Sequence, residues 1–226
     1  MTNTMKKLAV LLIGTLFVLC VAIVLAVSLP VSTAFAAEGE PEATVHDHTD
    51  GTWTALTADG GTLESGNYYL ASDVTLTNNN ITVADNATVT LCLNGYKLTG
   101  TGTGSVITVG AGKSFTLEDC QSASDAAECQ HKYYVAESGL WTFYDGDLPE
   151  AAPEGAETGV VAGGIITGGS AVQGGVHVNG TFIMTGGTIS GNSAYDSGGG
   201  VYEENGGIYN LTGCSISSKS SLNLAV

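Results

Sequence analysis

A group of aromatic residues lies between Lys132 and Asp147, and their types and spacing suit a binding role. They are Tyr133, Tyr134, Trp141, Phe143 and Tyr144. Aromatic rings offer a large flat apolar area, and Tyr and Trp add a polar edge, which together suit stacking on sugar rings. The same rings would also serve to pack this segment onto the rest of the protein. From the sequence, glycan contact and packing both stay open.

Groups that could act as catalytic acids or bases are few. Polysaccharide lyases use a basic residue to take a proton beside a uronate carboxyl and hold calcium with acids, whereas hydrolases use two neighbouring carboxylates. The chain contains no arginine, and its lysines beyond the N-terminal pair are Lys97, Lys113, Lys132 and Lys219. These lysines are far apart, and the acidic pairs Glu118–Asp119 and Glu203–Glu204 each lie where a strand pattern ends. We therefore expect no catalytic residues and no enzyme activity.

Three short motifs match metal or phosphate sites only in part. Gly112–Ser114 resembles the end of a phosphate-binding loop, but Ile107 replaces the first glycine of that motif and a strand pattern follows. Asp145–Asp147 lacks the spaced acids of a calcium loop and is typical of a turn. His46–His48 could hold a metal weakly, yet no cysteine lies near it in the sequence, and it is interpreted as a solvated stretch. The sequence thus predicts no metal and no cofactor.

The elements that would position these residues come from a repeat. Residues Gly174–Ala194 recur in altered form as Gly199–Ser218, with an offset of about 25 to 27 residues. Within one unit the apolar residues alternate, and glycine or Asn-Gly pairs separate three short strand patterns. This period, with three strands in each unit, predicts an all-β protein: a parallel β-helix, or solenoid, of about four to five turns.

The same period aligns earlier parts of the chain. The residues expected to line one continuous core are Ile81, Val83, Val89, Leu91, Ile107, Val109, Phe115, Leu117, Val176, Val178, Phe182 and Met184. His177 falls between two of these inward positions, so we expect it on the surface and not as a catalytic base.

In chain order, we expect a signal or anchor helix, a flexible acidic lead-in, an N-terminal cap, the β-helix and a tail. Their ranges are 1–36, 37–51, 52–80, 81–218 and 219–226. The period breaks in an insertion at 121–160, where residues 131–147 are expected to form a hairpin at a corner of the β-helix, followed by an acidic loop. Gly163–Gly169 mirrors Gly186–Asn192 and returns the chain to the repeat.

The N-terminus has the pattern of an export signal. Lys6 and Lys7 precede an apolar run, Leu8–Leu29, and the small-residue pattern Ala34–Ala36 follows it. Cleavage after Ala36 is one interpretation, and an uncleaved membrane anchor is the other, because a run of this length can span a bilayer. Either way, the protein is expected to be exported, as a secreted or cell-surface protein.

Charge and composition restrict the partners. The net charge of −16 opposes binding to nucleic acid and to anionic lipid, so membrane contact is expected only through residues 8–29 if they stay uncleaved. The 32 glycines and the low share of charged residues, 12%, favour strands joined by tight corners over helical folds.

The cysteines can be placed on the repeat. Cys120 and Cys214 occupy equivalent corners two turns apart, which is about 10 Å and too far for a disulfide. Cys120 with Cys129 is the pair that the spacing allows, and four free thiols beyond Cys20 are the alternative.

The end of the chain suggests an uncovered last turn. The residues after Ile216 are too few for another turn of about 25 residues. We therefore expect the strands from about Gly198 onward to fray, or to self-associate with a second copy through their unpaired edges.

Three segments together resemble a known family. They are Leu91–Val109, Lys132–Phe143 and Gly174–Asn192, and the resemblance extends over about Trp53–Ser217. They look like the exported, right-handed parallel β-helix (pectate-lyase-like) surface proteins of Gram-positive, mostly anaerobic gut bacteria. The resemblance implies a repetitive, adhesin-like cell-surface protein. Because the sequence stops at Val226 without a sorting motif or a wall-binding module, we expect a truncated member.

The predicted function is that of a non-catalytic, exported bacterial surface protein that contacts glycans or host and matrix surfaces. One alternative is a polysaccharide-degrading lyase or hydrolase, since helices of the pectate-lyase-like type often cut polysaccharides. Another is a carbohydrate-binding module carried by the aromatic insertion.

Overall fold

The computed structural model describes residues 46–77, 80–101, 104–122, 126–137, 141–171, 174–194, 199–204, 206–216 and 224–225. They all belong to one compact unit, Pro41–Val226. The apolar run Leu8–Leu29 and the predicted cleavage site lie outside the described residues. Among the helical elements that are described, none is long and apolar enough to cross a membrane.

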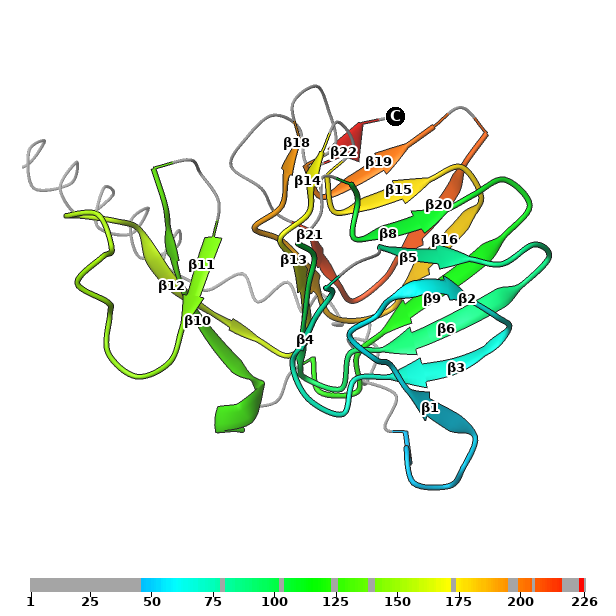
Figure 1. The fold of residues 1–226 in the computed structure, drawn as a ribbon, viewed down its shortest axis with the longest axis horizontal. Coiled ribbons are helices and arrows are strands. Elements are labelled where there is room, and N and C mark those ends of the chain that lie inside the picture. The colour runs from blue at the N-terminus through cyan, green and yellow to red at the C-terminus, as the bar shows by residue number, and fades with distance from the viewer. Residues whose placement is uncertain are drawn as a thin grey trace, which may run out of the picture. The chain divides into compact units, whose positions relative to one another are not determined.

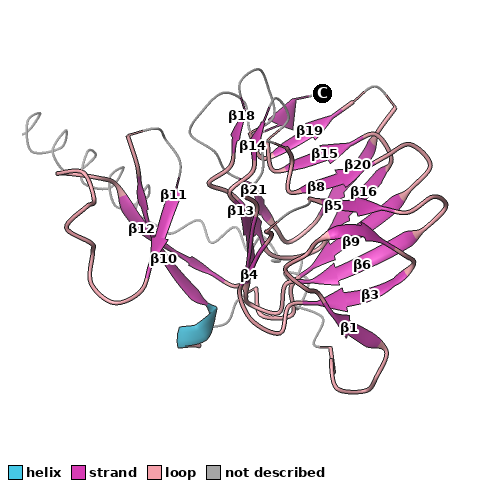
Figure 2. Ribbon diagram, in the orientation of Figure 1, coloured by secondary structure: helices cyan, strands magenta, loops and turns pink. Residues whose placement is uncertain are grey.

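Most of the fold consists of three parallel sheets, and the protein is all-β (Figures 1 and 2). In spatial order, sheet A contains β1 (Trp53–Ala55), β3 (Gly66–Tyr69), β6 (Thr88–Cys92), β9 (Ser114–Glu118), β16 (Thr181–Met184) and β20 (Ile208–Leu211). Sheet B contains β2 (Gly61–Leu63), β5 (Ile81–Val83), β8 (Ile107–Val109), β15 (Val176–Val178), β19 (Val201–Glu203) and β22 (Leu224–Ala225). Sheet C contains β21 (Ser215–Ile216), β17 (Thr188–Ile189), β13 (Ile165–Thr167), β7 (Lys97–Thr99) and β4 (Val74–Thr75). A small parallel sheet pairs β14 (Ser170–Ala171) with β18 (Ser193–Ala194).

Each passage of the chain adds one strand to sheet B, one to sheet A and one to sheet C. The strands β5, β6 and β7 make one passage, and β8, β9 and β13 make the next. Equivalent strands pair in parallel, with Ile81 opposite Ile107, Val89 opposite Phe115, and Val176 opposite Val201. These partners are the ones that the repeat alignment predicts, so the alignment is confirmed.

The predicted core is confirmed residue by residue. All the residues assigned to it, from Ile81 to Met184, belong to one buried hydrophobic cluster and are at most 1% exposed. Within the cluster the Phe115 and Phe182 rings stack with centroids 6.2 Å apart. Alternation explains the arrangement, since every second residue of these strands points between the sheets and is apolar.

A buried carboxylate joins the corners on either side of the insertion. Asp119 follows β9 and is only 4% exposed. Its carboxylate accepts hydrogen bonds from the backbone N–H groups of Gly95 at 2.8 Å, Gly164 at 2.7 Å and Gln121 at 3.2 Å. Gly95 belongs to the preceding passage, and Gly164 is where the chain returns from the insertion. Asp119 therefore fixes both ends of the insertion to the body of the protein.

The insertion, which lies between β9 and β13 in the sequence, forms a separate antiparallel sheet. Figure 1 shows it apart from the stacked strands. After the short 3-10 helix η1 (Ala127–Cys129), β10 (Gln130–Val135) pairs with β11 (Trp141–Tyr144), as the predicted hairpin requires. The sequence did not predict β12 (Thr158–Ala162), which pairs with the other edge of β10.

The segment predicted as an N-terminal cap, 52–80, contains strands that continue the stack. The strands β2, β3 and β4 pair with β5, β6 and β7, so this segment is a further passage of the repeat. Only β1 lies beyond it, as the first strand of sheet A. The pattern is weak in sequence because β3 has no buried residue and Gly66 stands opposite Val89 of the next passage.

The other end of the stack also differs from the prediction. Residues Val201 and Tyr202 of β19 pair with Leu224 and Ala225 of β22, so the last full passage is not bare along sheet B. The tail was expected to be too short to contribute, but a single two-residue strand suffices to cover this edge. In sheets A and C the last strands are β20 and β21, and Ile208 in β20 is 62% exposed.

We expect the amide hydrogens of β20 and β21 to exchange about tenfold or more faster than those of β16 and β17, because edge strands open more readily than central ones. The amides of β19, which lies between β15 and β22, are expected to be protected like those of β15. Hydrogen exchange with mass spectrometry on the full chain measures both. Equal protection of β20 and β16 in a protein that sediments as a monomer would contradict this prediction, and a concentration-dependent larger species would point to pairing of these edges between copies.

Candidate functional site

The aromatic residues of the insertion divide between the two faces of the β10–β11 hairpin. Tyr133 lies opposite Phe143, and Val135 lies opposite Trp141. Because side chains alternate along a strand, Tyr133, Trp141 and Phe143 share one face, and Tyr134 and Tyr144 share the other. The structure therefore does not bring all the predicted aromatic residues into one surface.

Two of these rings are packed within the protein, Tyr133 against β12 of the insertion and Trp141 against Gly191 outside it. The Tyr133 and Trp141 rings are stacked almost parallel, with centroids 3.6 Å apart. A Cβ at Gly159 of β12 would lie 2.6 Å from the Tyr133 hydroxyl, and a Cβ at Gly191 would lie 2.8 Å from the Trp141 Cβ. Both rings thus lie over glycines, and the packing interpretation fits this pair better than glycan contact.

Phe143 and Tyr144 border a pocket. Its volume is about 110 Å³, and it is lined by Lys97, His131, Lys132, Phe143, Tyr144 and Asp145. The Lys97 ammonium lies 5.4 Å from the centre of the Phe143 ring, within the range of a cation–π contact. Lys97 also forms an ion pair with Asp73. Lys132 donates a hydrogen bond of 2.8 Å to the Gly146 carbonyl.

Local contacts hold the pocket in place. The buried His131 ring contacts the Gly95 carbonyl oxygen through Nε2 at 2.8 Å, which fastens the first strand of the hairpin to the corner that Asp119 also holds. Tyr134 is buried and lies 6.2 Å from Tyr144, ring centre to ring centre. The segment Asp145–Asp147 bends at Gly146, where φ is +74°. The lining residues thus come from two parts of the fold, β7 of sheet C and the insertion.

The glycine-lysine-serine motif and His177, which the sequence singled out, make ordinary structural contacts. Gly112 has φ +74° in a turn, and Ser114 begins strand β9, so the strand expected after this motif is confirmed. Lys113 extends to Asp85 at 3.1 Å and to the Val83 carbonyl at 2.7 Å. His177 points away from the core between buried Val176 and Val178, as predicted, and its Nε2 lies 3.2 Å from a Glu204 carboxylate oxygen.

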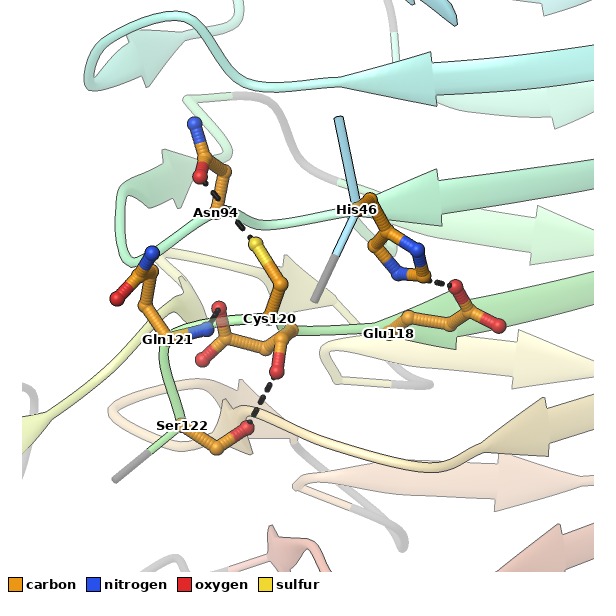
Figure 3. A network of polar contacts seen from close by, with 7 residues as sticks. His46, Asn94, Glu118, Cys120, Gln121 and Ser122 are labelled. Carbon is orange, nitrogen blue, oxygen red and sulfur yellow. Dashed lines mark hydrogen bonds and ion pairs between the residues drawn. The ribbon is translucent and has the colours of Figure 1, made fainter. Parts of the chain in front are cut away.

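The histidines of the lead-in are not solvated as the sequence suggested. The His46 side chain is 13% exposed, and its Nε2 lies 2.9 Å from a Glu118 carboxylate oxygen (Figure 3). The His48 ring is stacked on Tyr69 of β3, with centroids 4.5 Å apart and planes within 4° of parallel. Trp53 contacts both imidazoles, at 4.8 Å and 5.0 Å between ring centres. Aromatic packing holds this segment in place. The sequence did not indicate this packing because the residues around His46 and His48 are mostly polar.

Two cysteines that the sequence analysis did not pair lie beside His48. One side-chain donor atom from each of His48, Cys92 and Cys120 falls within 4.8 Å of the others. Cys92 and Cys120 are buried thiols, so the bridge considered between Cys120 and Cys129 is not formed. A hydrogen bond between the two sulfurs raises the pKa of Cys92 and lowers the pKa of Cys120. Burial lowers the pKa of His48, and the neighbouring His46 adds to this effect.

The sequence contained a signal for this cluster. The repeat alignment sets Leu91 on Leu117, so it also sets Asn94 on Cys120, and the Cys120 thiol does contact the Asn94 side-chain oxygen at 3.3 Å (Figure 3). Cys92 is two residues from Asn94, on the adjacent strand of the same sheet, where strands are about 4.8 Å apart.

The structure is thus that of an all-β protein of stacked parallel sheets, with a pocket beside its antiparallel insertion. Comparisons with protein-family models, with curated proteins and with solved structures found no match for this chain.

Proposed function

We propose that the protein is a non-catalytic, exported surface protein of the right-handed parallel β-helix (pectate-lyase-like) type, whose insertion contacts glycans. The stacking of one strand per passage in each of three parallel sheets supports this fold, because it is how a solenoid buries a continuous core. The resemblance of the repeat segments to exported bacterial surface proteins supports the location at the cell surface.

The pocket beside the hairpin is the observation that carries the glycan proposal. It is lined by the aromatic residues Phe143 and Tyr144, by Lys97 and Lys132, and by Asp145. Sugar sites combine an apolar ring with polar groups that bond to hydroxyls. At about 110 Å³ the pocket is smaller than the roughly 300–1,000 Å³ of sites that enclose a ligand, so it suits one sugar of a longer chain.

The lysines favour an acidic sugar over a neutral one. The Lys132 ammonium donates its hydrogen bond to the neutral Gly146 carbonyl oxygen, and this contact does not neutralise its positive charge. In a chain of net charge −16, a positive group at a pocket is a specific attraction for a uronate carboxylate.

The surroundings of the lysines also favour binding over catalysis. A lyase base must be deprotonated and must reach the sugar. Lys97 is paired with Asp73 and Lys113 with Asp85, so both ammonium groups are already engaged by carboxylates of the protein. Lys219 lies outside the described residues.

A glycan array tests the proposal, with the full chain probed against neutral and uronic-acid glycans. We expect wild type to bind uronic-acid glycans, and Lys132→Ala and Tyr144→Ala to weaken binding about tenfold or more. Tyr202→Ala, which removes an outward ring of sheet B beside His177, is the matched control and should bind like wild type. Absence of binding by wild type, or equal binding by all variants, would overturn the glycan proposal.

The enzyme alternative has its own test. Incubation of the protein with polygalacturonate is expected to give no unsaturated product, with or without calcium. A calcium-dependent rise in ultraviolet absorbance from such a product would show a lyase and contradict the non-catalytic assignment.

A further inference from the structure

We propose that His48, Cys92 and Cys120 bind a zinc ion, which fastens the segment before β1 onto sheet A. The three residues come from separate parts of the chain. Cys92 is the last residue of β6. Cys120 lies just after β9, the strand next to β6 in sheet A, and His48 precedes β1.

The geometry suits a small tetrahedral ion. The donor atoms lie within 4.8 Å of one another. With zinc–sulfur distances of about 2.3 Å and zinc–nitrogen distances of about 2.0–2.1 Å, tetrahedral ligands are about 3.5–3.8 Å apart. A contraction of at most about 1.3 Å would therefore close the site around the ion, and side-chain rotation can supply such a movement.

The burial of the donors points to a ligand. Cys92 is 0% exposed and Cys120 is 7% exposed. The Nε2 atom of His48 is also buried, and it has no hydrogen-bond partner among the described residues. Leaving a buried polar atom without a partner costs free energy. Coordination of a metal through Nε2 would remove that cost.

The donor set selects the metal. Two sulfurs and one imidazole nitrogen favour a borderline-soft ion such as Zn²⁺ over Ca²⁺ or Mg²⁺, which prefer oxygen ligands. The Asn94 Oδ1 atom, which accepts the Cys120 S–H at 3.3 Å, loses that hydrogen bond when the thiol ionises. Asn94 Oδ1 or a water molecule is then available as the fourth ligand, and each thiol that binds releases its proton to solvent.

Neighbouring rings hold the imidazole in position. Stacking on Tyr69 fixes the plane of the His48 ring, and the Trp53 ring lies nearly perpendicular to it with ring centres 5.0 Å apart. A ligand whose ring is held before the metal arrives loses less conformational freedom on binding. The expected role is structural, because the ion would join the N-terminal segment to two adjacent strands of sheet A.

Metal analysis of the full chain, purified under reducing conditions without chelator, tests the inference. We expect about one zinc per chain by elemental analysis, and replacement by Co²⁺ is expected to produce the charge-transfer band of thiolate ligands. The variants Cys120→Ser and His48→Gln should weaken zinc binding about tenfold or more and reduce the cobalt band. Cys214→Ser and His177→Gln, which change the same residue types elsewhere, should leave both unchanged.

Two results would overturn the inference. One is a reduced, folded wild-type chain that yields no thiolate band with Co²⁺. The other is a disulfide between Cys92 and Cys120 in protein recovered from its exported state, since the bridge would remove both sulfur ligands. His48→Gln changes a residue near the surface of the fold, so this variant keeps the test informative if Cys120→Ser fails to fold.

Discussion

Replacement of Asp119 by alanine is expected to lower the free energy of unfolding by about 2–6 kcal/mol. The substitution leaves the buried N–H groups of Gly95 and Gly164 without their acceptor, and each such loss costs about 1–3 kcal/mol. The Asp119 side chain lies inside a corner where water cannot easily replace it, since the residue is 4% exposed. Urea denaturation followed by circular dichroism measures the change.

An exposed carboxylate provides the control for this experiment. Asp85 pairs with Lys113 at 3.1 Å, but its side chain is 91% exposed. Asp85→Ala is therefore expected to change the free energy of unfolding by no more than about 1 kcal/mol, as is usual for surface ion pairs. Equal effects of the two substitutions would mean that the Asp119 hydrogen bonds do not hold the corner.

Phe182→Ala is expected to destabilise the fold by about 3–5 kcal/mol, the usual cost of removing a buried aromatic ring. Phe182 is 0% exposed and stacks on Phe115 of the preceding passage, so the cavity cannot be filled by a small movement of one neighbour. The midpoint of chemical denaturation should fall while the dependence on denaturant stays the same.

Ile183 supplies the matched control, because it follows Phe182 on β16 and points to the opposite face. Ile183→Ala should cost clearly less than Phe182→Ala, since its side chain is only partly buried. If Phe182→Ala lowers stability by less than about 1 kcal/mol, the ring is not enclosed as the structure has it.

The sheets and their register were predictable because the repeat places the same kind of residue at the same position in each passage. Val89, Phe115 and Phe182 are far apart in sequence but are paired in turn along sheet A. A period of about 26 residues with inward alternation leaves few other ways to stack the chain. Segments whose apolar positions are few, such as Gly61–Thr75, did not show this period, although they pair in the same way.

The candidate sites were less predictable because they depend on contacts outside the repeat. Strand β12 follows a long loop and meets β10 only through antiparallel pairing across the insertion. His48 precedes the first strand, and its position depends on stacking with Tyr69. The aromatic residues of the hairpin were recognised as a group, but their division between two faces required the register of Tyr133 with Phe143.

Because the insertion lies at a corner that Asp119 holds, its length and sequence are separate from the stability of the stacked sheets. Asp119 holds the chain just before the insertion and, through Gly164, just after it, so the stacked sheets continue whatever lies between. A loop whose ends are already fixed gains length at low cost, about 0.6 kcal/mol for each doubling. The corner can therefore exchange one insertion for another without rebuilding the core.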